Sequence, residues 1–244
     1  MLGLASQQRP QMPIPWDLEQ AVRLVRALYG EVQAELTKRS LDSLADRQFY
    51  AEYHYCEHKR LLREKLDSKL GELNVAQILL PMHQAGIDAI VTLEKKVAAQ
   101  VSACLQSLHA VGDTLAYATA MAAGLNLPPL SLAERGISLK SVADRLPGKF
   151  ELVAAELNAL RTNSEYVYLS ALVNHGKHRS VIEPRIYVDA TGAEARPYDL
   201  RIRAFTYDGI EYESREVQSI ELLAALLWAS VVKCGNMLNQ ALSV

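Results

Sequence analysis

The feature of this sequence that most constrains its fold is one long segment, residues 82–124, in which apolar residues recur every three or four positions and no proline occurs. This spacing is typical of a helix. From residue 97 to residue 133, Asp113 is the only formally charged side chain, so the segment is apolar on nearly every side. A helix of that kind has to be surrounded by other helices. The segment therefore predicts a helical bundle with this helix, the longest, at its centre.

The same periodicity predicts five more helices around the central one. Asp17 and Ser138 are residues of the type that caps helix N-termini, and each precedes a periodic segment. Thr162 and Glu165 have the spacing of a capping box, which predicts a restart or a kink inside one of these helices. Pro81 interrupts the pattern before the central helix. The expected ranges are 17–36, 44–70, 138–146, 150–174 and 219–242.

The period changes after Arg179, where apolar and polar residues begin to alternate. Residues 181–188, 200–207 and 210–213 are rich in β-branched and aromatic side chains, as strands are. The last two segments are joined by Asp208 and Gly209, which are typical of a two-residue hairpin turn. Because an isolated ribbon is only marginally stable, we expect these strands to lie on the helices.

Together these segments predict the fold class and the domain organisation. We expect a mainly α fold: a bundle of about five or six helices with a small antiparallel β hairpin or sheet inserted before the last helix, at about residues 181–215. Residues 1–16 are interpreted as a flexible N-terminal lead-in, and residues 17–244 as a single domain. We reject a boundary near residue 180, because the remaining stretch of about 65 residues is small for an independent core.

The charge balance limits the partners that the chain attracts. Its 26 Lys and Arg against 28 Asp and Glu leave a formal net charge of −2, so any polyanion site has to be local. The three cysteines form no CxxC pair, and the N-terminus lacks the apolar stretch of a signal peptide, which favours a cytoplasmic protein. No P-loop or dinucleotide-binding glycine motif occurs, so we expect no cofactor.

Two solitary charges stand out in otherwise apolar helices. Lys233 is the only charged side chain after Leu222, as Asp113 is in the central helix. An unpaired buried carboxylate is costly, so we expect Asp113 to be paired, protonated or facing a water-filled cleft. One interpretation pairs Asp113 with Lys233 or places both at helix ends, and neither helix is interpreted as membrane-spanning. His109 lies one turn before Asp113, and Gly112 would let another side chain approach closely.

The segment densest in groups that bind phosphate or transfer protons is residues 174–179, Asn-His-Gly-Lys-His-Arg. If the helix continues past Gly176, then Asn174, Lys177 and His178 share one face and the other two basic side chains point elsewhere. The alternative is that Gly176 ends the helix and that the basic side chains offset the negative end of its dipole.

This segment resembles the motif of the HEPN superfamily, helical nucleotide-binding domains of higher eukaryotes and prokaryotes. The motif is an Arg, then a polar residue and, a few positions on, a His near the end of a late helix. Asn174 and His178 match the polar residue and the His, whereas Val173 occupies the Arg position. The family also places a polar or acidic side chain from an earlier helix against the motif, a role that His109 with Asp113 would fill.

The resemblance covers about residues 85–180 and implies a function. Catalytic members are metal-independent endoribonucleases, in which His acts on the 2′-hydroxyl or the leaving oxygen while Arg steadies the charge on the phosphate, often across a homodimer. Other members are non-catalytic binding modules. The resemblance implies that His178 is the general acid or base, that Asn174 orients the phosphate or the ring, and that Asp113 orients an imidazole.

Because Val173 stands at the arginine position, Lys177 or Arg179 would have to stabilise the charge on the phosphate. Lysine lacks the planar, two-pronged guanidinium of arginine, so whether the chain cleaves RNA is an open question. The first hypothesis is therefore an RNA- or nucleotide-binding protein, with metal-independent endoribonuclease activity as an open question. The candidate catalytic residues are His178, Asn174, Lys177 and Asp113, and the candidate substrate-binding residues are Arg179, His109 and His175.

The second hypothesis, from a different class, is a non-enzymatic helical interaction module in which the same residues form a helix cap and a buried ion pair. We expect a homodimer and no membrane attachment.

Two further patterns lie in the charged helix at residues 47–69. His54, Glu57 and His58 match the HxxEH zinc motif of inverzincin peptidases, but no strand-like sequence precedes them, so we interpret them as a polar or partner-facing surface and expect no metal. The nearby aromatic residues could stack bases, although interleaved carboxylates favour a solvated or dimer surface. They are Phe49, Tyr50, Tyr53 and Tyr55.

Overall fold

The computed structural model describes residues 15–66, 84–188 and 198–244, and it confirms a mainly α fold with a small antiparallel sheet before the last helix. These residues contain seven α-helices, because the predicted helix 150–174 is two helices. The helices are α1 (Leu18–Tyr29), α2 (Glu31–Lys65), α4 (Gln84–Ala122), α5 (Leu139–Arg145), α6 (Glu151–Thr162), α7 (Ser164–His178) and α8 (Ser219–Leu242).

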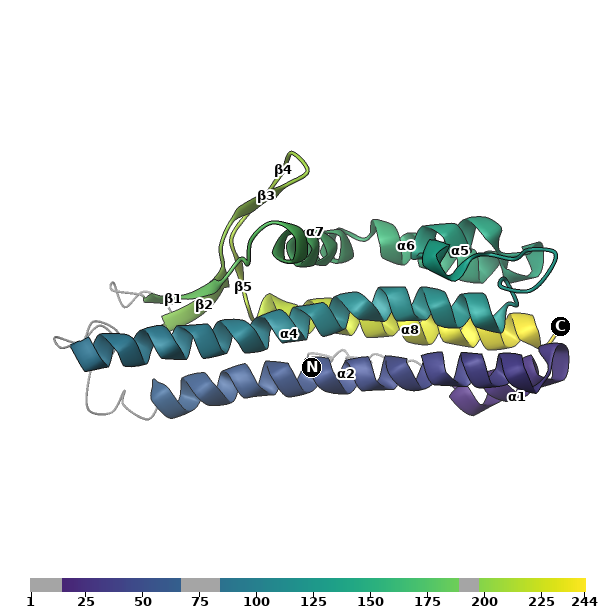
Figure 1. Cartoon of the computed structure of the whole chain (residues 1–244), viewed down its shortest axis with the longest axis horizontal. Coiled ribbons are helices and arrows are strands. Elements are labelled where there is room, and N and C mark those ends of the chain that lie inside the picture. Colours follow the sequence, from purple (N-terminus) through teal and green to yellow (C-terminus); the bar gives the residue numbers. More distant parts are fainter. Residues whose placement is uncertain (1–14, 67–83, 189–197) are drawn as a thin grey trace, which may run out of the picture.

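The two long rods of the molecule are α2 and α4, which lie side by side and run in opposite directions (Figure 1). α8 lies along the same bundle, and α5, α6 and α7 form a layer on the other side of α4 from α2 (Figure 1). With 39 residues, α4 is the longest described helix, and its buried side chains run from Leu93 to its end. The predicted central helix is therefore confirmed, whereas its first turns, residues 84–92, are largely exposed.

The first break between helices falls at Gly30, not within residues 37–43 as predicted. Gly30 has φ +87°, a left-handed backbone that glycine adopts without strain. Residues 37–43 are helical, and the hydroxyls of Thr37, Ser40 and Ser43 are satisfied within the helix by donating hydrogen bonds to the carbonyls one turn earlier. The serine- and threonine-containing stretch thus continues α2 instead of ending a helix.

Some predictions fall at or beyond the edges of the described ranges. Trp16 is buried, and its indole N–H donates to Asn239 Oδ1 at 3.2 Å, so the predicted lead-in 1–16 is wrong at its last residue. Residues 1–14 lie outside the described ranges. The predicted helix end near residue 70 and the break at Pro81 do so as well.

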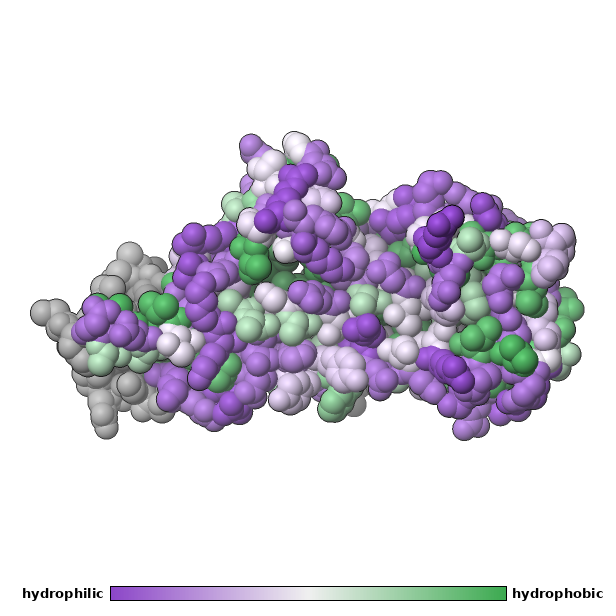
Figure 2. Space-filling model, in the orientation of Figure 1, coloured by the Kyte–Doolittle hydropathy of each residue, from purple (hydrophilic) through white to green (hydrophobic). Residues whose placement is uncertain are grey.

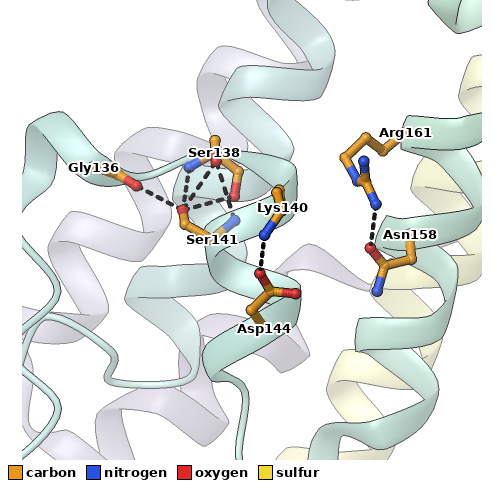
Figure 3. A network of polar contacts seen from close by, with 7 residues as sticks. All are labelled: Gly136, Ser138, Lys140, Ser141, Asp144, Asn158 and Arg161. Atoms are coloured by element: carbon orange, nitrogen blue, oxygen red, sulfur yellow. Dashed lines mark hydrogen bonds and ion pairs between the residues drawn. The ribbon is translucent and has the colours of Figure 1, made fainter.

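Capping residues set the limits of the short helices. The Ser138 hydroxyl accepts a hydrogen bond from the backbone N–H of Ser141, whose own side chain bonds the backbone N–H of Ser138, as Figure 3 shows at the start of α5. Between α6 and α7 the cap is Asn163 rather than Thr162, and it accepts hydrogen bonds from two backbone N–H groups of the first turn. The predicted restart is confirmed one residue later than expected.

The β segments form a three-stranded sheet and a separate hairpin. β1 (Pro184–Val188), β2 (Tyr198–Ile202) and β5 (Arg215–Glu216) pair antiparallel in the order β1-β2-β5. The hairpin of β3 (Phe205–Tyr207) and β4 (Ile210–Tyr212) projects from the bundle (Figure 1).

The turn of this hairpin confirms the prediction made for Asp208 and Gly209. Their φ angles are +49° and +80°, and positive φ at both central residues is what a type I′ hairpin turn requires. The predicted strand 200–207 is in fact two short strands, β2 and β3. Buried strand residues join the hydrophobic core of the helices, so the β insertion packs on the bundle.

The surface mixes polar and apolar residues. On the face drawn in Figure 2, hydrophilic residues cover much of the β3–β4 hairpin and alternate with apolar ones along the bundle. α8 is the one helix of the described ranges that is long and apolar enough to cross a membrane, and 33% of its most apolar window is buried within the structure. Its exposed apolar residues include Leu222 and Leu226.

Candidate functional site

The end of α7 carries the polar cluster singled out in the sequence, and the helix continues past Gly176 to His178. The alternative prediction, a helix that ends at Gly176, is therefore wrong. Asn174, Lys177 and His178 share one face at positions i, i+3 and i+4, as expected for a continuous helix. Asn174 is half-buried, and Lys177 and His178 are exposed.

The other two basic residues of the cluster hold the β3–β4 hairpin against α7. The ring of His175 packs edge-on against Phe205 and Tyr207, with centroids 5.8 and 6.4 Å apart. Arg179 donates a hydrogen bond to Asp208 at 2.8 Å and lies over the Tyr207 ring, 4.9 Å from its centroid. These contacts give His175 and Arg179, the predicted substrate-binding residues of this segment, a structural role.

A second group of predicted residues lies where α4 meets α7. His109 is buried, and its ring stacks parallel to that of Tyr166 at 6.2 Å. His109 Nδ1 is 3.9 Å from Asp113 Oδ2, which is beyond hydrogen-bonding distance. Burial lowers the pKa of His109; Asp113 opposes this decrease and the nearby ammonium of Lys177 adds to it. Burial and the charge of Lys177 therefore both disfavour the imidazolium form of His109.

Asp113 does not meet Lys233, so the predicted ion pair is wrong. The side chain of Asp113 is 69% exposed, although it lies in the middle of an apolar helix. Lys233 Nζ instead lies 2.6 Å from Glu156 Oε2, and the Glu156 side chain is only 8% exposed. The reason is the packing of α8 against α6, which puts Lys233 beside α6 rather than α4. Asp113 therefore lies on the open surface of α4, and no described pocket is lined by it.

Sequence reasoning missed Tyr166, which packs against α4 beside His109 and Gly112. Burial, with a smaller contribution from Asp113, raises the pKa of Tyr166. The signal for this contact was Gly112: a Cβ there would come within 1.9 Å of Tyr166 Oη, so only glycine admits the phenol. The expected close approach of a side chain to Gly112 is confirmed.

Val173, at the position of the motif arginine, is 5% exposed and belongs to the hydrophobic core. A guanidinium at this position would be buried rather than presented to a phosphate. Arg179 is paired with Asp208 and also lies over the Tyr207 ring, which places its side chain toward the hairpin, whereas Lys177 has neither kind of contact among the described residues. Within the described ranges, neither Lys177 nor His178 has a carboxylate partner.

The HxxEH residues on α2 are engaged in other contacts. His54 Nδ1 is 2.6 Å from Gln100 Oε1, and Glu57 pairs with Arg60. His58 is 4% exposed, and burial lowers its pKa to about 4. Its Nδ1 is a buried atom without a hydrogen-bond partner among the described residues. In the part of the chain that the structure describes, no three His, Cys, Asp or Glu side chains are grouped to hold a metal ion.

Comparison of the chain with protein-family models, with curated proteins and with solved structures finds no match.

Proposed function

We propose that the protein binds a phosphate-bearing ligand, RNA or a nucleotide, at the face of α7 formed by Asn174, Lys177 and His178. The observation that carries this proposal is the division of the polar cluster: His175 and Arg179 hold the hairpin, and the other three side chains are left together on one face. An ammonium, an amide and an imidazole are groups that contact phosphate oxygens in nucleic-acid interfaces.

The geometry supports binding more than cleavage. Lysine contacts a phosphate as a point charge and lacks the bidentate fork that would stabilise a transition state. His109 is largely buried, which disfavours its imidazolium form, and Asp113 is too far from it to orient the ring. If cleavage occurs, His178 is the general acid or base and Lys177 stabilises the charge on the phosphate, because these are the exposed groups of the site.

A binding measurement tests the proposal. Fluorescence anisotropy with a labelled single-stranded RNA and with a labelled nucleotide would compare the parent with Lys177→Gln, and Lys140→Gln on α5 is the matched control, since Lys140 is also an exposed lysine. We expect about threefold to tenfold weaker binding for Lys177→Gln, no change for Lys140→Gln, and tighter binding at low salt. Equal affinity of parent and Lys177→Gln, or no binding by the parent, would contradict the proposal.

The nuclease question has a separate test. Labelled RNA is incubated with the parent and with His178→Ala, which changes an exposed side chain. Cleavage by the parent that is lost in His178→Ala supports a ribonuclease. Equal cleavage by both, or none by either, removes the nuclease version and leaves the binding proposal standing.

The second candidate is a non-enzymatic helical interaction module. The observation that favours it is the set of exposed aromatic side chains on α2: Phe49, Tyr50 and Tyr53 are 64%, 45% and 54% exposed.

A further inference from the structure

The outer face of α2, away from α4, has an apolar centre. Phe49 and Tyr53 lie one turn apart, and their rings stack with centroids 6.4 Å apart. Both are more than half exposed, although the core side of the same helix buries Ala51, His58 and Leu62. Large aromatic side chains that gather on a surface mark an interaction site more often than single ones do.

Charges flank this aromatic centre symmetrically. Asp42 lies two turns before Phe49, and Arg60 lies two turns after Tyr53. At 100° per residue all four side chains fall on one stripe of the helix. Their side chains are exposed: that of Asp42 by 58% and that of Arg60 by 50%. The stripe reads acid, aromatic, aromatic, base, with the same spacing on both sides of residue 51.

This order is complementary to itself when the helix is reversed. In an antiparallel pair of α2 helices related by a twofold axis near residue 51, Phe49 of one copy faces Tyr53 of the other, and Asp42 faces Arg60. Each contact occurs twice, as in any isologous interface. On α2 itself, Asp42 pairs with Lys38, and Arg60 pairs with Glu57 and Glu64. Such exposed pairs within a helix are weak, so they do not prevent pairing across the interface.

We propose that the outer face of α2 is a homodimer interface, formed by antiparallel packing of two copies through Asp42, Phe49, Tyr53 and Arg60. The occupant is a second copy rather than RNA, because the carboxylates of Asp42 and Asp46 on this face repel a polyanion. One helix pair buries an area at the low end of specific interfaces and is held by few side chains, so we expect a dimer that dissociates on dilution. It does not depend on the phosphate site of α7, which lies on the other side of α4 (Figure 1).

Sedimentation velocity at protein concentrations from about 1 to 200 μM, high enough to populate a dimer with a small interface, tests the proposal. Asp42→Arg and Arg60→Asp each place like charges opposite one another, and each should weaken the dimer at least tenfold. The double variant with both changes exchanges the signs and should return most of the affinity. Glu52→Arg, an exposed charge reversal on the flank of α2, is the matched control and should leave the dimer unchanged.

Phe49→Ser provides a second variant in which the charges are untouched. Because Phe49 is exposed, the fold should be kept, which circular dichroism would confirm, while the dimer is weakened about tenfold or more. A parent that stays monomeric over the whole concentration range would overturn the proposal. So would a dimer that survives Phe49→Ser, or a folded double charge variant that fails to regain affinity. The Lys177→Gln variant should dimerise like the parent in the same sedimentation experiment. The dimer proposal and the phosphate-binding proposal can therefore fail independently of one another.

Discussion

The phenol of Tyr166 fills the space that a side chain at position 112 would need, with Tyr166 Oη only 1.9 Å from an ideal Cβ on Gly112. Gly112→Ala should therefore destabilise the protein by about 1–3 kcal/mol through overpacking. At a solvent-exposed helix position the same substitution stabilises a protein by up to about 1 kcal/mol. Urea unfolding followed by circular dichroism measures the difference.

Gly176→Ala is the matched control for this prediction. Gly176 also lies inside a helix, but nothing is within 4 Å of an ideal Cβ there. This variant should be as stable as the parent or more stable. A Gly112→Ala protein that unfolds at the same urea concentration as the parent would show that α4 and α7 are not in contact as described.

Gly235→Ala tests how the N-terminal end of α1 is attached to α8. A Cβ at Gly235 would overlap the indole of Trp16, with ring carbons at 1.9 and 2.4 Å. The indole would have to leave its site and lose its hydrogen bond to Asn239. We expect a red-shifted tryptophan fluorescence and lower thermal stability. Because Trp228 also emits, Trp16→Phe gives the background spectrum, and an unshifted spectrum for Gly235→Ala would contradict the contact.

Lys233→Met removes the partner of a buried carboxylate, that of Glu156. Water reaches the pair from the lysine side, which is 60% exposed, so the expected loss is about 1–3 kcal/mol. Combining Lys233→Met with Glu156→Gln removes the unpaired charge and should recover part of this loss. Chemical denaturation of the four proteins in this cycle measures the coupling, and additive effects would show that the two side chains do not interact.

Acid should weaken the fold through His58. Its pKa is lowered from 6.5 to about 4 in the folded protein, mainly because burial disfavours the imidazolium. The stability that the neutral ring provides is complete above the unfolded pKa of 6.5 and is lost as the pH falls toward 4. The upper bound for this loss is about 3 kcal/mol.

His58→Gln is the comparison for the pH prediction, because glutamine does not titrate. Its unfolding free energy should fall less between pH 7 and pH 4 than that of the parent. A smaller pH dependence should remain, since His109 also has a lowered pKa. Identical pH profiles for His58→Gln and the parent would exclude His58 as the source.

Periodicity and turn chemistry were sufficient to predict much of the fold. The limits of α8 and the central place of α4 follow from the spacing of apolar residues, and the Asp208-Gly209 hairpin follows from two residues that tolerate positive φ. The expected helix ranges left a gap at residues 37–43, whereas the structure breaks at Gly30. The hydrogen bonds by which the hydroxyls of Thr37, Ser40 and Ser43 are satisfied within α2 are not visible in a sequence.

The sequence predicted the candidate site correctly only where the arrangement depends on the geometry of a single helix. The shared face of Asn174, Lys177 and His178 follows from helical geometry along α7. The partner of Lys233 depends on which helix packs against α8. The sequence suggested an ion pair with Asp113, whereas in the structure Lys233 pairs with Glu156. The two solitary charges were correctly recognised as unusual, but the pairing of residues distant in sequence is a property of tertiary packing.

The anchoring of α7 on two sides has a consequence for recognition. Near the start of α7, Tyr166 packs against Gly112, and at its end His175 and Arg179 contact the β3–β4 hairpin. With both ends fastened, the helix cannot turn about its own axis. The direction of its polar stripe is thus set before any ligand arrives, and the entropy of orienting that stripe is lost during folding instead of during association.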